Sequence, residues 1–222
     1  LGVLFDKSYN GAGFKISHVL KGSQATLPYS KLNVGDIITS VNEKPIEAGS
    51  SELDTFLQVP SKVVHLHVTN PEGEERTLDI TPSSFQSSRA LANAEEIDKA
   101  EALVKKLSNN KLGYIHVERM MWNEFEKFER HLHEKGYGKD GIIIDVRNNG
   151  GGFTTDHLLT VLNQKRHAFT IPRNGGAGYP QDRIVYATWE KPIIVLCNQN
   201  SFSNAEIFTH AIKTLKRGKV VG

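Results

Sequence analysis

The sequence predicts two kinds of fold in succession, a small β-rich domain and then an α/β domain. Residues 1–82 hold short stretches of alternating apolar and polar residues separated by turn residues, a pattern typical of half-buried strands. From residue 112 onward, apolar strand-like runs alternate with amphipathic helical segments, which is typical of a parallel sheet covered by helices. We therefore expect domains at 1–82 and 111–222, joined by a linker and helix at 83–110.

The first domain is expected to be mostly strand. Leu1 opens directly on an apolar strand, and four further strands are predicted at 14–19, 36–41, 63–68 and 76–80. One short helix fits 51–58, where the apolar residues share one face. A hairpin turn at 70–73, with the sequence Asn-Pro-Glu-Gly, precedes the last strand.

The remainder of the chain changes from a polar linker to alternating strands and helices. A serine-rich linker is predicted at 83–88, and a helix rich in alanine, glutamate and lysine is predicted at 90–107. The expected elements of the second domain are strands at 112–117, 141–147 and 192–197, helices at 123–135, after the glycines at 150–152 and at 204–217, and a Gly/Pro-rich loop at 173–183. Gly218 is expected to end the last helix.

The two ends suggest that the chain is a fragment of a longer protein. It begins with Leu1 rather than methionine, and no signal peptide precedes the first strand. Residues 219–221 resemble the first residues of a strand that is not continued. We therefore expect the second domain to be incomplete at its C-terminus.

Composition excludes several functional classes. The chain has 222 residues and a net charge of +2 from 27 basic and 25 acidic side chains, which argues against nucleic acid as a partner. No apolar run approaches the roughly 20 residues of a membrane span. The single cysteine, Cys197, lies in an apolar strand and is expected to be a small buried side chain rather than half of an intrachain disulfide.

A glycine turn in the first domain suggests peptide binding. Gly11, Ala12, Gly13 and Phe14 directly precede an alternating strand, and successive N–H groups in such a turn can accept a carboxylate. We expect that strand to offer an edge and the helix at 51–58 to form the other wall of a groove. The alternative is a small β-domain in which these glycines only turn the chain.

Further motifs in the first domain resemble the PDZ family. The run at 19–25 ends in Gly-Ser-Gln-Ala, the run at 32–38 contains Gly-Asp-Ile-Ile, and a strand-like segment with its turn follows at 41–46. The resemblance covers about the first 80 residues. It implies that the domain binds peptide C-termini.

Ser203 and the glycines at 150–152 suggest acyl-transfer chemistry. Each follows an apolar, parallel-type strand, and the carboxyl ends of such strands lie on one rim of the sheet. Ser203 offers a hydroxyl at a helix N-terminus, and the glycine turn offers backbone N–H groups. The structural alternative is a capping box, in which Ser203 and Glu206 satisfy the first N–H groups of the helix.

A dinucleotide-binding fingerprint is the competing interpretation of the glycine turn. That fingerprint would need glycine or alanine at position 155, where Thr155 stands. It would also need an acidic residue about 20 positions further on, at the end of a strand. We therefore favour the acyl-transfer interpretation.

The second domain resembles the tricorn proteases, in the serine peptidase clan that includes the C-terminal processing proteases. The motifs that carry this resemblance lie at 112–117, 145–152, 198–207 and 215–222, and the order of PDZ domain and core matches as well. The resemblance implies a partial ClpP/crotonase-like serine peptidase core that hydrolyses peptides through an acyl-enzyme on Ser203. The N–H groups of Gly152 and Asn204 would form the oxyanion hole. It also implies no metal or organic cofactor, a homo-oligomeric parent protein, and a cytoplasmic location, with a periplasmic one left open.

The general base that the nucleophile needs is not evident in the chain. In the tricorn group a Ser-His pair precedes the PDZ domain and a glutamate follows the nucleophile, and we expect both to lie outside this chain. His157 is the only local candidate, and an ordinary helix position is the favoured alternative for it. Ser201 is a rival hydroxyl and is interpreted as a turn residue. Thr170 and Ile171 stand where tricorn proteins can place an acidic residue that selects basic substrates, so the substrate preference is open.

Two other functional classes remain open. The chain could belong to a non-catalytic protein whose PDZ groove captures peptides and whose α/β part is a scaffold. It could also belong to a crotonase-like acyl-CoA enzyme, which uses the same backbone oxyanion chemistry but gives no role to Ser203. Both alternatives make testable predictions about Ser203.

Overall fold

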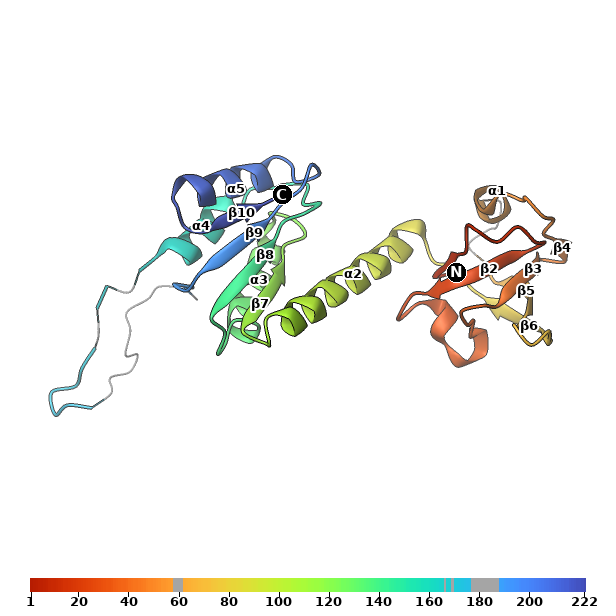
Figure 1. Cartoon of the computed structure of the whole chain (residues 1–222), viewed down its shortest axis with the longest axis horizontal. Coiled ribbons are helices and arrows are strands. Elements are labelled where there is room, and N and C mark those ends of the chain that lie inside the picture. Colours follow the sequence, from red (N-terminus) through yellow and green to blue (C-terminus); the bar gives the residue numbers. More distant parts are fainter. Residues whose placement is uncertain (58–61, 166, 169, 177–187) are drawn as a thin grey trace. The chain divides into compact units, whose positions relative to one another are not determined.

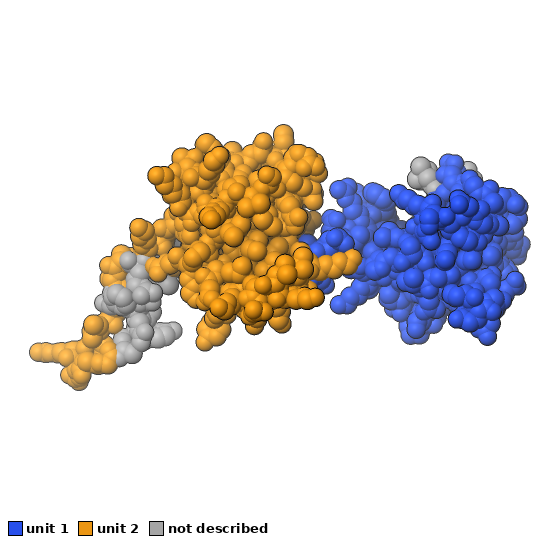
Figure 2. All heavy atoms as spheres, viewed as in Figure 1, with its two compact units in different colours: residues 1–98 blue, residues 99–222 orange. Residues whose placement is uncertain are grey.

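The computed structural model describes residues 1–57, 62–165, 167–168, 170–176 and 188–222 (Figure 1). These residues form two compact units, Leu1–Asp98 and Lys99–Gly222, which are described separately (Figure 2). The last residue of the helix predicted at 51–58 and part of the loop predicted at 173–183 lie outside the described residues. Within the described part of the chain, no helix is long and apolar enough to span a membrane.

The first unit is built on a six-stranded sheet in which every pairing is antiparallel. Its strands are β1 (Val3–Phe5), β2 (Phe14–Val19), β3 (Ile37–Val41), β4 (Lys44–Pro45), β5 (Val64–Thr69) and β6 (Glu75–Ile80). The order across the sheet is β1-β2-β3-β5-β6, and β4 pairs with β3. Helix α1 (Glu52–Leu57) and two 3₁₀ turns (Gln24–Thr26 and Pro28–Ser30) complete the unit.

The alternation seen in the sequence corresponds to burial on one face of this sheet. All four strands predicted between residues 14 and 80 occur, shifted by at most one residue at either end. In β5, Val64, Leu66 and Val68 are buried in the core, whereas His65 and His67 are exposed. The period-2 pattern therefore predicted both the strands and their inward faces.

The edge of this sheet lies at a different strand from the one predicted. β2 pairs with β1 on one side and with β3 on the other, so it has no free edge. The prediction that the strand after the 11–14 turn offers an edge is therefore wrong. The physical reason is that 3–5 and 14–19 form a hairpin, in which Val3 pairs with Val19 and Phe5 with Ile16. The sheet order places β1 at one edge and β6 at the other.

The glycine turn at the start of β2 also uses one of its N–H groups internally. The N–H of Gly13 donates a hydrogen bond of 2.9 Å to the carbonyl oxygen of Ile46. Gly13 has φ +88°, and a Cβ atom there would lie 2.7 Å from the carbonyl oxygen of Ile38. Close packing against β3 accounts for glycine at this position.

Helix α2 (Phe85–Leu107) begins inside the stretch predicted as a polar linker. Ser84 explains the difference, because its hydroxyl accepts a hydrogen bond of 3.1 Å from the N–H of Ser87, as an N-cap does. No described residue of α2 is buried. Serine-rich composition here reflects a capped, solvent-exposed helix start rather than a linker.

The second unit contains a four-stranded parallel sheet with the order β10-β9-β8-β7. Its strands are β7 (Leu112–His116), β8 (Gly141–Asp145), β9 (Ile193–Leu196) and β10 (Lys219–Val221), and its helices are α3 (Trp122–Glu134), α4 (Thr155–Asn163) and α5 (Asn204–Thr214). Alternate residues of β8 and β9 share one hydrophobic core with the apolar faces of all three helices. This confirms the mixed α/β fold predicted for this part of the chain.

Helix α5 ends at Thr214, three residues before the predicted end. Lys216 adopts φ +54°, and the N–H of Arg217 bonds the carbonyl oxygen of Ile212 at 3.0 Å. This is the hydrogen-bond pattern of a Schellman cap, with lysine in the position where glycine was expected. Gly218 is required for another reason, since a Cβ atom there would lie 2.6 Å from the carbonyl oxygen of Ile193.

Candidate active site

The loops that follow β8 and β9 meet at the carboxyl ends of these neighbouring strands. A Cβ atom built on Gly151 would lie 2.8 Å from the Cβ of Ser203 and 3.0 Å from the backbone nitrogen of Asn204. Glycine at position 151 therefore allows the glycine turn to lie directly against the start of α5. The sequence placed both loops on one rim of the sheet, and the structure puts them in contact.

The glycine turn is held against the loop that follows β7. The N–H of Met120 donates to the carbonyl oxygen of Gly151 at 3.0 Å, and the N–H of Phe153 donates to that of Met120 at 2.7 Å. Gly152 lies between these two bonds and has φ +150°. Among the described residues, its own N–H has no hydrogen-bond partner. The turn therefore holds the unused N–H of Gly152 in a fixed position.

Ser203 is exposed and has an unusual backbone conformation, with φ +54° and ψ −118°. A non-glycine residue in such a sparsely populated region costs about 1–3 kcal/mol and is retained only where its surroundings impose it. The capping-box pattern with Glu206 is present, and the Glu206 carboxylate accepts the N–H of Ser203 at 2.6 Å. Capping accounts for the serine and glutamate together, but it does not account for the positive φ. A strained serine between a strand and a helix is also how serine hydrolases present a nucleophile.

Asn204, the first residue of α5, is held in place by hydrogen bonds from α4. Its side-chain Oδ1 accepts the N–H of Thr155 at 2.9 Å, and its carbonyl oxygen accepts the Thr155 hydroxyl at 2.7 Å. Within the described part of the chain, the N–H of Asn204 has no recorded partner. Asn204 and Gly152 thus both carry an unused backbone donor, and each is the next residue after one of the contacting pair Ser203 and Gly151.

Asn149 has a structural role that the sequence analysis did not assign. It is completely buried, and its Nδ2 donates to the carbonyl oxygen of Val117 at 2.8 Å. Its Oδ1 accepts the N–H of Gly151 at 2.8 Å, and its carbonyl oxygen accepts the N–H of Phe202 at 2.9 Å. An asparagine two residues before a glycine is a known turn signal, because its side chain can bond the backbone two positions ahead. That signal was present at 149–151.

Ser201 is held as a turn residue. It is 8% exposed, its hydroxyl donates to the carbonyl oxygen of Val146 at 2.8 Å, and it accepts the N–H of Asn198 at 3.0 Å. A hydroxyl oxygen committed to two backbone groups in this way is poorly placed to attack a substrate. Of the two nearby serines, only Ser203 is exposed.

An ionic cluster around the buried carboxylate of Asp145 lies at the end of β8. The Asp145 carboxylate accepts bonds from the Tyr114 hydroxyl at 2.7 Å and from the Arg147 guanidinium at 2.5 Å. Although burial opposes ionisation of Asp145, the hydrogen bonds from Arg147 and Tyr114 hold its pKa below the ordinary value. Burial and the bond to Asp145 raise the pKa of Tyr114. Asp145 is therefore an ionised structural group, and both of its carboxylate oxygens already accept hydrogen bonds.

His157 packs against aromatic rings instead of Ser203. Its ring lies edge-on to Trp122, with centroids 5.3 Å apart, and 5.5 Å from the ring of Phe125. Within the described residues, no histidine, lysine or tyrosine side chain hydrogen-bonds Ser203. The described part of the chain therefore offers a hydroxyl and two backbone donors, without a histidine, lysine or tyrosine bonded to that hydroxyl.

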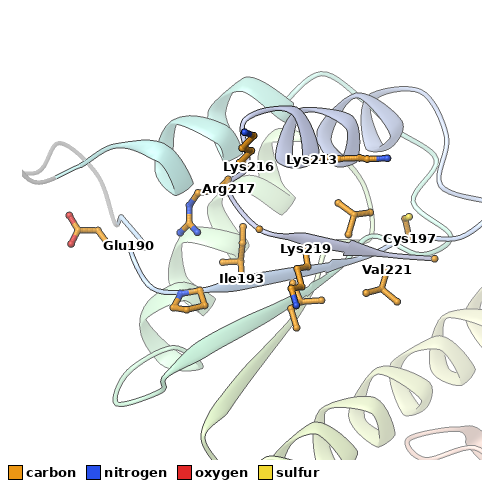
Figure 3. A pocket seen from close by; sticks show the side chains of 13 residues that line it. Glu190, Ile193, Cys197, Lys213, Lys216, Arg217, Lys219 and Val221 are labelled. Carbon is orange, nitrogen blue, oxygen red and sulfur yellow. The ribbon is translucent and has the colours of Figure 1, made fainter.

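A cavity of about 1100 Å³ lies elsewhere in the second unit, over β9, β10 and the end of α5 (Figure 3). Lys213, Lys216 and Lys219 line it, and neither Ser203 nor Gly152 does. Arg217 also lines it, but its guanidinium donates to the carbonyl oxygens of Trp189 at 2.5 Å and Lys191 at 3.0 Å. This cavity is separate from the site around Ser203.

Comparison with known proteins gives consistent similarities. The family model described as Peptidase family S41 matches residues 111–222. The tricorn protease of Thermoplasma volcanium is 26% identical over 228 residues, covering 98% of this chain and 21% of that protein. The tricorn protease homolog of Saccharolobus solfataricus is 27% identical over 230 residues, covering 100% of this chain and 20% of that protein.

A solved structure has the same fold. The crystal structure of the tricorn protease superposes with a TM-score of 0.71 at 22% identity, covering 98% of this chain and 21% of that one. The chain thus spans about one fifth of the length of these relatives.

Proposed function

This chain belongs to peptidase family S41, and from that premise we propose that the whole protein is a tricorn-like serine peptidase that cleaves peptides through an acyl-enzyme on Ser203. The observation that carries the proposal is the contact between the glycine turn and Ser203. It puts Gly151 against the exposed Ser203, and the next residues along the two loops, Gly152 and Asn204, each have an unused backbone N–H. Hydrolysis by a serine nucleophile needs this combination.

In the proposed reaction, the Ser203 Oγ attacks the carbonyl carbon of the scissile peptide bond and its proton passes to a base. The carbonyl oxygen becomes negatively charged and accepts hydrogen bonds from the N–H groups of Gly152 and Asn204. The C–N bond then breaks, the base returns the proton to the leaving amine, and water hydrolyses the resulting ester. Each oxyanion donor of this kind contributes roughly 10²–10³-fold to kcat.

The base is proposed to come from a segment of the protein outside this chain. This part of the proposal rests on two facts: the chain spans about one fifth of its relatives, and no described histidine, lysine or tyrosine side chain hydrogen-bonds Ser203. A serine hydroxyl is almost fully protonated at neutral pH and needs a hydrogen-bonded base to react. The homo-oligomeric assembly of the full-length protein, which the resemblance implies, stays a prediction.

Covalent labelling tests this proposal. A serine-directed phosphonate should label the full-length protein at Ser203, as mapped by mass spectrometry, and should stop its hydrolysis of fluorogenic peptides. The 222-residue chain alone should show neither labelling nor turnover, because the base is proposed to lie outside it. Thioester hydrolysis by an unlabelled full-length protein would favour a crotonase-like acyl-CoA enzyme instead. Binding of peptides without any hydrolysis would favour a scaffold protein.

We also propose that the first unit is a PDZ-like module that binds a peptide along the free edge of β1. On the side that faces the 14–20 segment, Gly2 accepts a hydrogen bond through its carbonyl oxygen and Asp6 donates one through its N–H. Because the backbone groups of successive strand residues point to alternate sides, those of Val3 and Phe5 face outward. The ring of Phe5 stacks on Phe56 of α1, with centroids 5.8 Å apart. An extended peptide added to β1 would therefore lie between that strand and α1.

A proline substitution tests the position of this groove. Val3→Pro removes an outward-facing N–H while leaving the bonds between β1 and β2, so the unit should fold and bind peptide about fivefold more weakly. Calorimetry should also show that a peptide with a free C-terminus binds more tightly than its amidated copy. Equal affinities of the two peptides would exclude carboxylate recognition, and unchanged binding by the variant would exclude the β1 edge.

A further inference from the structure

The two proposed oxyanion donors come from different loops, which raises the question of what fixes their separation. Gly152 lies seven residues beyond the end of β8, and Asn204 lies eight residues beyond the end of β9. The ladder between these strands pairs Asp145 with Leu196 and does not extend into the loops. A shift of about 1 Å between catalytic groups can cost roughly 100-fold in rate. The loops therefore need their own connections.

Asn149 supplies the connection for the glycine turn. It bonds three segments at once: the strand end at Val117, the turn at Gly151, and the residue before Ser203 through the N–H of Phe202. All three bonds lie between 2.8 and 2.9 Å, and the Asn149 side chain is completely buried. Hydrogen bonds in such a site are not exchanged with water, so they hold one geometry.

Thr155 supplies the connection for Asn204. Its N–H and its hydroxyl bind the side chain and the carbonyl oxygen of the same asparagine, at 2.9 and 2.7 Å. Thr155 is 2% exposed and opens α4, whose chain leads directly from the glycine turn. The two-point contact fixes both the position and the rotation of Asn204 relative to Gly152.

We infer that Asn149 and Thr155 are positioning residues that hold the N–H groups of Gly152 and Asn204 at the separation one oxyanion requires. Neither side chain contacts the reacting atoms in this arrangement, and both act through the loops that they join. The inference rests on the proposed function, because it assigns the two donors to a single negatively charged oxygen. It predicts that these residues support kcat and leave substrate binding almost unchanged.

Thr155→Val in the full-length protein is the primary test. Valine keeps the shape of threonine and the backbone N–H bond, and it removes only the hydroxyl bond to Asn204. We expect kcat to fall by about 10- to 100-fold with KM unchanged, and phosphonate labelling of Ser203 to slow in parallel. Asn149→Asp, which loses the donor to Val117 but keeps the acceptor for Gly151, should give the same division between kcat and KM.

Thr154→Val is the matched control. Thr154 is the neighbouring threonine, and it is completely buried. Within the described residues, however, its hydroxyl oxygen has no hydrogen-bond partner. The control should therefore retain the kcat of the wild type. Circular dichroism checks the fold of each variant, and Thr155→Val decides the question if Asn149→Asp does not fold.

The outcomes separate this inference from the proposed function. If the phosphonate labels Ser203 and the Thr155→Val variant still has the kcat of the wild type, the inference is overturned and the proposed function is not. A rise in KM with constant kcat would also overturn it, because that result indicates a role in substrate binding. Absence of turnover and labelling in the wild-type full-length protein would instead overturn the proposed function.

Discussion

Replacing Ser203 with alanine is expected to lower kcat of the full-length protein by about 10⁵- to 10⁶-fold, because loss of a serine nucleophile removes the covalent route. A residual rate of about 10³- to 10⁴-fold over water should remain, since the backbone donors at Gly152 and Asn204 are intact. Fluorogenic peptide hydrolysis under single-turnover conditions measures both. Peptide binding by the first unit should not change, since Ser203 belongs to the second unit.

Ser203→Gly is the informative companion to this variant. Both variants lack the hydroxyl, but alanine keeps the positive φ of +54° whereas glycine adopts it without strain. The glycine variant should therefore be as inactive as the alanine variant and more stable than it by about 1 kcal/mol. Denaturant unfolding measures this difference. Hydrolysis by either variant at the wild-type rate would show that Ser203 is not the nucleophile.

Replacing Gly152 with alanine is expected to destabilise the second unit by about 2–5 kcal/mol. Its new Cβ atom would lie 2.0 Å from the carbonyl oxygen of Met120, a completely buried residue that cannot move aside without disturbing the core. The φ of +150° at Gly152 adds strain for any residue with a side chain. Peptide hydrolysis should be lost as well, because the variant cannot keep the turn that presents this N–H.

Gly150→Ala is the control for this prediction. It changes a glycine in the same turn, but a Cβ atom there meets nothing within 4 Å, and Gly150 does not have a positive φ. Its unfolding midpoint and its kcat should match the wild type. If the two variants were equally destabilised, the effect would come from flexibility of the turn as a whole rather than from the contact with Met120.

Some features of the site could be predicted because they depend on local patterns. Two apolar runs of parallel type, each followed by a polar or glycine-rich loop, indicate neighbouring strands whose loops share one rim. The structure confirms that the loops carrying Gly151 and Ser203 are in contact. The start of α2 was also encoded locally, in the cap formed by Ser84 and Ser87, but its serines were interpreted as a linker.

Other features depend on pairing between distant residues and were not predictable from one sequence. In the first sheet the edge strand next to the 14–19 strand is β1, because the two form a hairpin. Alternating residues predict that a strand is half-buried, but they do not say which neighbours it pairs with. We therefore propose the peptide groove at β1, and peptide binding by the 11–14 turn stays a prediction.

By itself, the sequence determined the succession of β-rich and α/β parts, nearly all of the strands and the presence of Ser203 beside a glycine turn, because period, turn residues and capping residues act over a few positions. Only the tertiary structure decided the positive φ of Ser203 and the distant partners of Asn149 and Thr155, which are Val117 and Asn204. Those partners are 32 and 49 residues away in the chain. A hydrogen bond across such a distance forms only after the sheet has brought the loops together, so it leaves no local pattern to read.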